Sequence, residues 1–258
     1  MLNEQKINVV MHLWYEETSL FLIDKLSKVW SGEVHVSLIR GSESNETLIS
    51  KMKEKFAEVH AYELSQNFGN DQIGFWKILR KIKNKKQWTL YLHDKHPDKI
   101  EWINDIVDPI INNAKIINKM IEEDNDFGES KYGIISSGHK QRMVKILTES
   151  CLVEIDKNTP KEDKLEIVLS RQTLVWLREL QYILYNEYGL IEKEQLNFYF
   201  TSGTMFVINT EVAEMAHACV CENFFPECYR KDGDVTHALE RFYYYVSLCS
   251  GRKNEFIT

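Results

Sequence analysis

The fold is decided by the stretch Ile7-Asn-Val-Val-Met-His-Leu-Trp14, a short apolar run near the start of the 258-residue chain. Such a run is typical of a strand that is buried on both faces of a parallel sheet. Amphipathic helices follow at about residues 18–29 and 46–56, and further strands at residues 34–39 and 59–64. Strands and helices that alternate at these lengths predict a right-handed parallel α/β sheet.

The remainder of the chain continues this pattern. We expect a strand at residues 87–92, a helix at about 98–123, a strand at 132–138 and mostly helix over 140–190. No repeat or linker divides the chain, so we predict a single α/β domain with one Rossmann-like, mainly parallel sheet flanked by helices. Four leucines of the later helical region are expected to be core residues: Leu174, Leu177, Leu180 and Leu184.

Composition limits the class of protein. Hydrophobic residues make up 43% and charged residues 28%, as in soluble globular proteins, and the net charge of −7 argues against a nucleic-acid coat protein. We expect no signal peptide and no transmembrane segment, and five cysteines without framework spacing favour reduced thiols in the cytoplasm. A zinc site is conceivable, but its spacing is atypical and a buried helix is favoured there; its ligands would be His217, Cys219, Cys221 and Cys228.

A polar break separates two expected strands within residues 197–209. Ser202, Gly203 and Thr204 are small, two of them carry hydroxyl groups, and glycine allows a ligand to approach the backbone closely. A ligand site between two buried strands and a simple hairpin turn are both compatible with this pattern.

Polar residues also follow the third and fourth strands, where parallel sheets bind ligands. Asn67, Asn70 and Asp71 could hold a sugar or a base, although Asn70 or Asp71 could equally cap the next helix. His93 and Lys95 are two residues apart, which suits phosphate neutralisation or proton donation. A solvated turn before the next helix would explain the same residues.

The last informative segment begins a helix at about Asp234. His237, Glu240 and Arg241 lie within one helical turn of one another, so His237 shares a face with either neighbour. They could form a surface ion-pair cluster, or they could present a carboxylate base and a basic group to the break at Gly203.

Five segments together resemble the ordered signature of the rhamnan synthesis protein F family, and the resemblance spans about residues 7–245. The segments are VVMHLWY at 9–15, NFGNDQIGF at 67–75, LHDK at 92–95, SGTMF at 202–206 and HALER at 237–241. That family is regarded as glycosyltransferase-like and is associated with bacterial surface polysaccharides. The resemblance implies a fold similar to GT-A-type transferases, with residues 7–95 binding the donor and 96–245 the acceptor.

The same resemblance implies transfer of a sugar such as rhamnose from a nucleotide-diphosphate donor, dTDP-rhamnose being one candidate, to a glycan or lipid-linked glycan. The enzyme would work in the cytoplasm or at the inner face of the membrane, without nucleic acid. A non-catalytic carbohydrate- or nucleotide-binding module of an assembly complex is the alternative.

For an inverting transfer, Glu240 would be the general base, with Asp71 as the second candidate. His93 and Lys95 would stabilise the departing diphosphate, which needs positive charge where negative charge develops. The remaining residues that the resemblance implies for substrate binding are Asn67, Gly69, Ser202, Gly203, Thr204, His237 and Arg241.

The chain departs from the family pattern at the expected donor site. Asn70 stands in place of an arginine, and Asp94 and His96 stand where the family has threonine and lysine. Both changes lower the positive charge. Asp124-Asn-Asp126 reads as a solvated turn and not as an Asp-x-Asp at a strand end, so we expect metal-independent chemistry without a cofactor.

Overall fold

The computed structural model describes residues 1–65, 70–123, 130–146, 152–156, 167–168, 171–190, 198–225 and 234–258. Its larger sheet has seven strands: β1 (Ile7–Leu13), β2 (Glu33–Ile39), β3 (Glu58–Leu64), β4 (Trp88–His93), β5 (Tyr132–Ser137), β10 (Phe206–Asn209) and β11 (Lys253–Ile257). Their order across the sheet is β11-β5-β10-β4-β1-β2-β3. Neighbouring strands are parallel except at β10, which runs antiparallel to both β4 and β5. The predicted α/β class with a mainly parallel sheet is confirmed.

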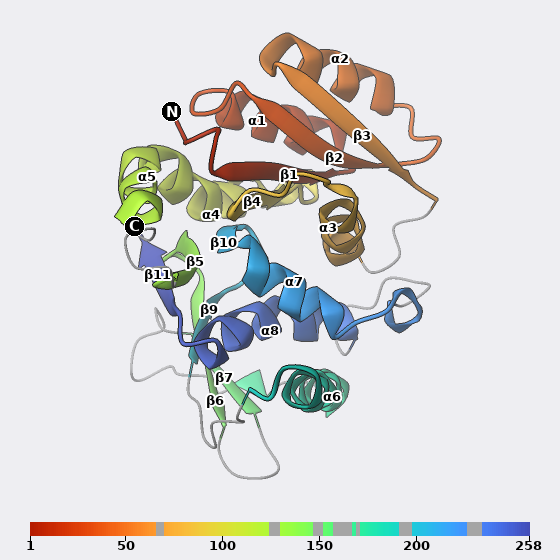
Figure 1. Cartoon of the computed structure of the whole chain (residues 1–258). Helices are drawn as coiled ribbons and strands as arrows, with labels where there is room; N and C mark the ends of the chain where they lie inside the picture. Colours follow the sequence, from red (N-terminus) through yellow and green to blue (C-terminus); the bar gives the residue numbers. More distant parts are fainter. Residues whose placement is uncertain are drawn as a thin grey trace.

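A smaller antiparallel sheet lies beside the larger one (Figure 1). It consists of β6 (Gln141–Ile146), β7 (Leu152–Asp156), β8 (Ile167–Val168) and β9 (Phe198–Thr201), in the order β8-β7-β6-β9.

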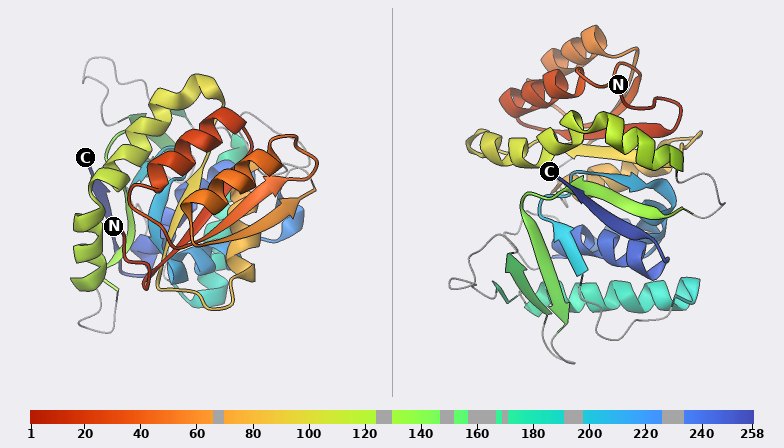
Figure 2. Two further views of the ribbon diagram at one scale, coloured as in Figure 1. Left: turned by 90° about the horizontal axis from the view of Figure 1, so that it is seen from above. Right: turned by 90° about the vertical axis from the view of Figure 1, so that its left-hand side faces the viewer.

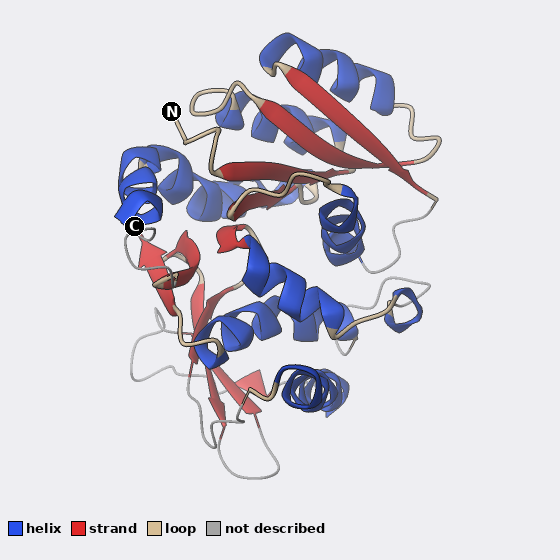
Figure 3. Ribbon diagram, viewed as in Figure 1, coloured by secondary structure: helices blue, strands red, loops and turns tan. Residues whose placement is uncertain are grey.

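Helices cover both faces of the larger sheet (Figures 2 and 3). The helices are α1 (Glu16–Leu26), α2 (Asn45–Lys55), α3 (Asn70–Lys81), α4 (Ile100–Asn112), α5 (Ala114–Glu123), α6 (Arg171–Tyr188), α7 (Thr210–Ala218) and α8 (Val235–Cys249), with short 3-10 turns at Pro97–Lys99 and Glu222–Phe224. Of these, α6 packs against α8 and lies beyond it as seen from the larger sheet (Figure 1). None of the helices in the described ranges is both long enough and apolar enough to cross a bilayer.

Alternation along the strands produces two separate apolar cores. Val9 and Met11 of β1 pack in a core with α1, α2, α4 and α5, whereas Val10 packs in a second core with α3, α6, α7 and α8. Successive side chains of a strand point to opposite faces, so a strand that is apolar throughout supplies both cores. Leu177, Leu180 and Leu184 are buried in the second core as expected, and the Leu174 side chain lies outside the described part.

The prediction of mostly helix over residues 140–190 is wrong. Strands β6, β7 and β8 occupy part of that region, and α6 begins only at Arg171. In β6, Gln141 and Val144 are buried while Arg142 is partly exposed, so no simple alternation marks this strand. The helix expected at 98–123 is divided at Asn113, whose side chain donates to the Pro109 carbonyl at 2.9 Å. The closing strand β11 was not predicted.

A buried histidine in the second core makes stability depend on pH. The His217 ring contacts the Tyr243 hydroxyl at 2.8 Å, and that hydroxyl lies 3.2 Å from Gln72 Oε1. Burial lowers the pKa of His217 to about 3. Unfolding therefore takes up a proton below the ordinary histidine pKa of about 6.5, and stability is lost as the pH falls below that value.

We expect His217→Gln to reduce the loss of stability that accompanies a fall in pH. Glutamine cannot take up a proton, so the slope of unfolding free energy against pH should fall by about 1.4 kcal/mol per pH unit near pH 5. Urea unfolding between pH 4.5 and 7.5 measures the slope. The control is His96→Gln, because His96 is exposed in the fold; equal slopes in wild type and His217→Gln would contradict the prediction.

Candidate functional site

The site is centred on the turn between β9 and β10. These strands do not form a hairpin, because β9 pairs with β6 in the smaller sheet and β10 lies between β4 and β5 in the larger one. Gly203 and Thr204 both have positive φ angles, of 109° and 49°. A positive φ is uncommon for a β-branched residue such as threonine and costs about 1–3 kcal/mol, so the surrounding contacts must hold the turn in place.

The backbone of Gly203 is held from two sides. Its carbonyl oxygen accepts a hydrogen bond from His93 Nε2 at 2.5 Å, and its N–H donates to Glu240 Oε1. The Thr204 hydroxyl lies 3.4 Å from the same Glu240 oxygen. The Trp102 ring fills the space beside Gly203, since a Cβ there would lie 1.7 Å from that ring. The room left by the glycine is therefore taken by Trp102 and is not open to a ligand.

His93 connects the end of β4 to the helix that follows β3. Its Nε2 lies 3.2 Å from Asp71 Oδ2, as well as bonding to Gly203, and its side chain is 2% exposed. Its Nδ1 lies 2.9 Å from the Asp94 carbonyl oxygen, so both ring nitrogens face backbone carbonyl oxygens. Burial lowers the pKa of His93 to about 4, which leaves the ring neutral near pH 7.

Asp71 lies in the first turn of α3, where the helix dipole favours negative charge. The Tyr91 hydroxyl donates to its backbone carbonyl at 2.7 Å. Burial alone would raise the pKa of the Asp71 carboxyl. The neighbouring His93 and Lys95, together with smaller contributions from His12 and a backbone hydrogen bond, outweigh burial and hold that pKa below its usual value. Asp71 is therefore an ionised carboxylate near pH 7, with its side chain 15% exposed.

Asp94 has a role that the sequence did not reveal. Its carboxylate accepts hydrogen bonds from the backbone N–H groups of Trp14, at 2.8 Å, and Tyr15, and from the Ser19 hydroxyl at 2.8 Å. It thus joins the end of β4 to the beginning of α1. Burial raises the pKa of Asp94 to about 6. The Asp94 carboxylate is therefore turned toward α1.

Lys95 provides a positive charge two residues after the carboxyl end of β4. Its ammonium lies 5.3 Å from the centre of the Trp102 ring, within the range of a cation–π contact. Its backbone carbonyl accepts a hydrogen bond from the Thr18 hydroxyl at 2.6 Å, which fixes the chain after the strand. His96 is exposed, with Nδ1 2.9 Å from Asp98 Oδ1.

The first turns of α8 complete the site. Asp234 caps the helix and lies 3.0 Å from His237 Nδ1. Burial lowers the pKa of His237, but the hydrogen bond to Asp234 and the negative charges of Asp234 and Glu240 together outweigh burial and raise it overall. Arg241 pairs with Glu240 Oε2 at 3.3 Å and lies over the Phe200 ring at 5.0 Å. The segment therefore forms an ion-pair cluster and also places a carboxylate against the Gly203 turn.

The structure brings together four of the predicted residues in one chain of contacts: Asp71, His93, Gly203 and Glu240. Ser202 lies beside them, with its N–H 3.2 Å from the Lys140 carbonyl. Asn67 and Gly69 lie outside the described residues, as do Asp124, Asp126 and Cys228. Two carboxylates and a buried imidazole on one backbone turn can accept and relay protons. Sequence reasoning missed Trp102 and Tyr91, which carry no local signal of a site.

A polar hollow of about 680 Å³ lies elsewhere, near the amino end of β4. Two of its basic side chains are already paired, Lys85 with Glu214 at 2.5 Å and Arg252 with Glu211. His93 lies at the opposite, carboxyl end of β4, so this hollow is separate from the chain of contacts around Gly203.

Comparison with known proteins identifies one relationship. A family model described as rhamnan synthesis protein F matches residues 1–251 of the chain. No curated protein matches. The match includes every residue of the Gly203 site.

We expect Gly203→Ala to cost much more stability than Gly41→Ala. Gly41 also has a positive φ, of 77°, but a Cβ there would have no neighbour within 4 Å. Alanine at Gly41 should therefore cost only backbone strain of about 1–2 kcal/mol. Alanine at Gly203 adds the collision with Trp102, and we expect a loss at least about 2 kcal/mol larger. Urea unfolding compares the two, and equal losses would contradict the close packing of Trp102 on the turn.

Proposed function

The chain belongs to the rhamnan synthesis protein F family, which functions in polysaccharide biosynthesis, and we propose that it is a glycosyltransferase. It transfers a sugar, with rhamnose as the favoured candidate, from a nucleotide-diphosphate donor to a growing cell-surface glycan or lipid-linked glycan. The reaction takes place on the cytoplasmic side of the membrane. Residues 7–95 form the donor half and residues 96–245 the acceptor half.

The main support for this proposal is that Asp71 and Glu240 are both linked to the Gly203 turn. Asp71 reaches it through His93, and Glu240 binds it directly. The turn lies beside the carboxyl end of β4, which is where open α/β sheets bind their ligands. A sugar hydroxyl is a poor nucleophile until a base accepts its proton, and both carboxylates are candidates for that base.

Glu240 is the preferred base. A carboxylate has about four acceptor positions, and the Gly203 N–H, the Thr204 hydroxyl and Arg241 occupy three of them. Within the described part of the chain, one position is left for an acceptor hydroxyl. Arg241 Nη1 lies 3.3 Å from Glu240 Oε2, so the guanidinium holds that side of the carboxylate in place.

Lys95 is the group best suited to stabilise the departing diphosphate. It carries positive charge at the end of β4 and lies near Asp71. His93 is buried and neutral near pH 7, so its role is to position Asp71 and the Gly203 carbonyl. In this arrangement the protein supplies the cation itself, consistent with metal-independent transfer.

The alternative is a non-catalytic binding module. It is favoured by the fact that Glu240 and Asp71 already have partners within the protein, as structural carboxylates do. Release of free nucleoside diphosphate from a nucleotide sugar separates the two functions. A transferase releases it slowly even without acceptor, whereas a binding module retains the intact donor.

We expect Glu240→Gln to reduce turnover by at least about 100-fold, which is the usual contribution of a general base. Glutamine retains the acceptor oxygen for the Gly203 N–H, so the melting temperature and the donor Kd should change little. Donor turnover is measured by release of nucleoside diphosphate. Glu222→Gln, at an exposed glutamate paired with Lys77, is the matched control.

Substantial activity in Glu240→Gln would eliminate Glu240 as the base and transfer the role to Asp71. Asp71→Asn would then be the inactive variant. Activity in both single variants at the wild-type level would contradict the proposed chemistry at this turn.

A further inference from the structure

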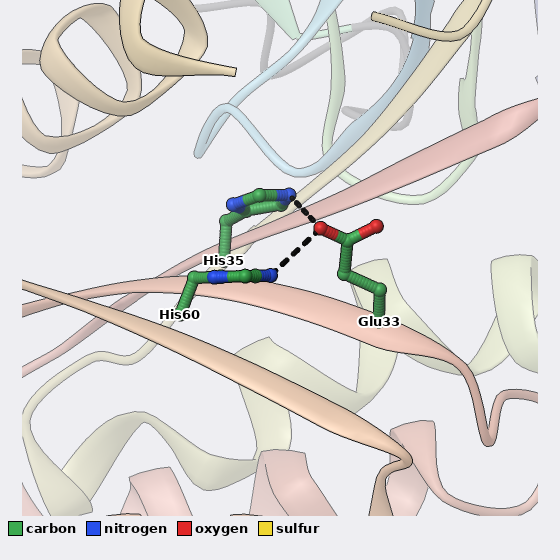
Figure 4. Close-up of side chains that lie close together, drawn as sticks. All are labelled: Glu33, His35 and His60. Atoms are coloured by element: carbon green, nitrogen blue, oxygen red, sulfur yellow. Dashed lines mark ion pairs between the residues drawn. The ribbon is translucent and has the colours of Figure 1, made fainter. Parts of the chain in front are cut away.

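A second group of ionisable side chains lies on β2 and β3, away from the Gly203 turn. Glu33 and His35 are two residues apart on β2, and His60 is the register partner of His35 on β3. All three come from the amino-terminal halves of their strands, whereas the candidate active site lies beside the carboxyl end of β4. Figure 4 shows both imidazole rings turned toward the Glu33 carboxylate.

The spacing of the donor atoms fits one small metal ion. Glu33 Oε1 lies 3.1 Å from His35 Nε2 and 2.8 Å from His60 Nε2. All three donor atoms lie within 4.8 Å of one another. Ligands bound tetrahedrally to Zn²⁺ at 2.0–2.1 Å are about 3.3 Å apart. Side-chain shifts of a few tenths of an ångström would therefore bring the two oxygen–nitrogen distances to that value.

The rings are also prepared for ligation. His35 Nδ1 contacts the Tyr62 hydroxyl at 3.2 Å, so Nδ1 can carry the proton while the lone pair of Nε2 faces Glu33. The two rings stack with their centres 4.7 Å apart, an arrangement that directs both Nε2 atoms to one side.

A simple ion pair explains less of this geometry. His60 Nε2 is buried and has no hydrogen-bond partner among the described residues, although two carboxylate oxygens are near it. Those oxygens belong to Glu33 and to Glu58, whose Oε1 is 3.2 Å away. Neither lies where a ring N–H would donate. The buried nitrogen therefore has its lone pair available for another partner.

We propose that Glu33, His35 and His60 bind one divalent transition-metal ion, with Zn²⁺ as the best match. Two imidazoles and a carboxylate are a donor set that Zn²⁺ prefers, whereas Mg²⁺ and Ca²⁺ prefer oxygen donors alone. Glu58 is the nearest additional carboxylate and can supply the fourth ligand.

The ion would join the edge of the sheet to its interior. β3 is the last strand on its side, so it pairs only with β2 along its length. A metal bound by residues of both strands adds a crosslink at their amino ends, and its binding energy stabilises the fold. This role is independent of the proposed transferase activity.

Zinc binding to the full chain tests the proposal. The protein is stripped with a chelator, and Zn²⁺ alone is titrated by calorimetry while the melting temperature is followed in parallel. We expect one tight site per chain and a rise in melting temperature. His60→Gln and Glu33→Gln should each weaken that site at least about 10-fold and remove the thermal shift.

His96→Gln is the matched control, because His96 is exposed and also lies against a carboxylate, that of Asp98. It should leave both the zinc affinity and the thermal shift at the wild-type level. Co²⁺ provides a spectroscopic check, since a tetrahedral site with nitrogen ligands gives visible absorption that His60→Gln should abolish. The proposal is overturned if wild type has no saturable site, or if Glu33→Gln and His60→Gln bind Zn²⁺ as wild type does.

Discussion

The structure around the candidate site depends on the two hydrogen bonds that hold the backbone of Gly203. One comes from His93 at the end of β4 and the other goes to Glu240 in α8. Because the chain crosses from one sheet to the other at this turn, these bonds fix the smaller sheet, α8 and the central strand relative to one another. Trp102 of α4 closes the remaining side.

This constraint explains why the turn combines strain with buried polar groups. Thr204 is buried and has a positive φ, which a short loop would ordinarily avoid. A buried imidazole and a largely buried carboxylate are costly unless they are paired, and here each is satisfied by the same glycine backbone. The strained, desolvated turn holds Asp71, through His93, and Glu240 in fixed positions. Such a support is what an acid–base site needs, since rate depends on positions held to within about 0.5 Å.

The first half of the fold could be predicted from sequence because its strands are apolar runs between amphipathic helices. Strands β6, β7 and β8 could not, since runs of six, five and two residues are too short for strand periodicity to be distinguished from helical periodicity. His93 and Glu240 were identified because strand ends and helix starts have recognisable residues. Their connection through Gly203, and the packing of Trp102, depend on contacts between residues 37 to 110 positions apart, which no local pattern encodes.

Binding of the nucleotide-sugar donor is the most direct test of the transferase function. Melting temperature would be measured with a panel of nucleoside diphosphates and their sugars, in the presence and absence of magnesium or manganese. A ligand that binds only the folded state raises the melting temperature according to its affinity. The proposed chemistry predicts a shift with a deoxythymidine-diphosphate sugar that needs no added metal. Failure of every nucleotide to shift the transition, with or without metal, would contradict it.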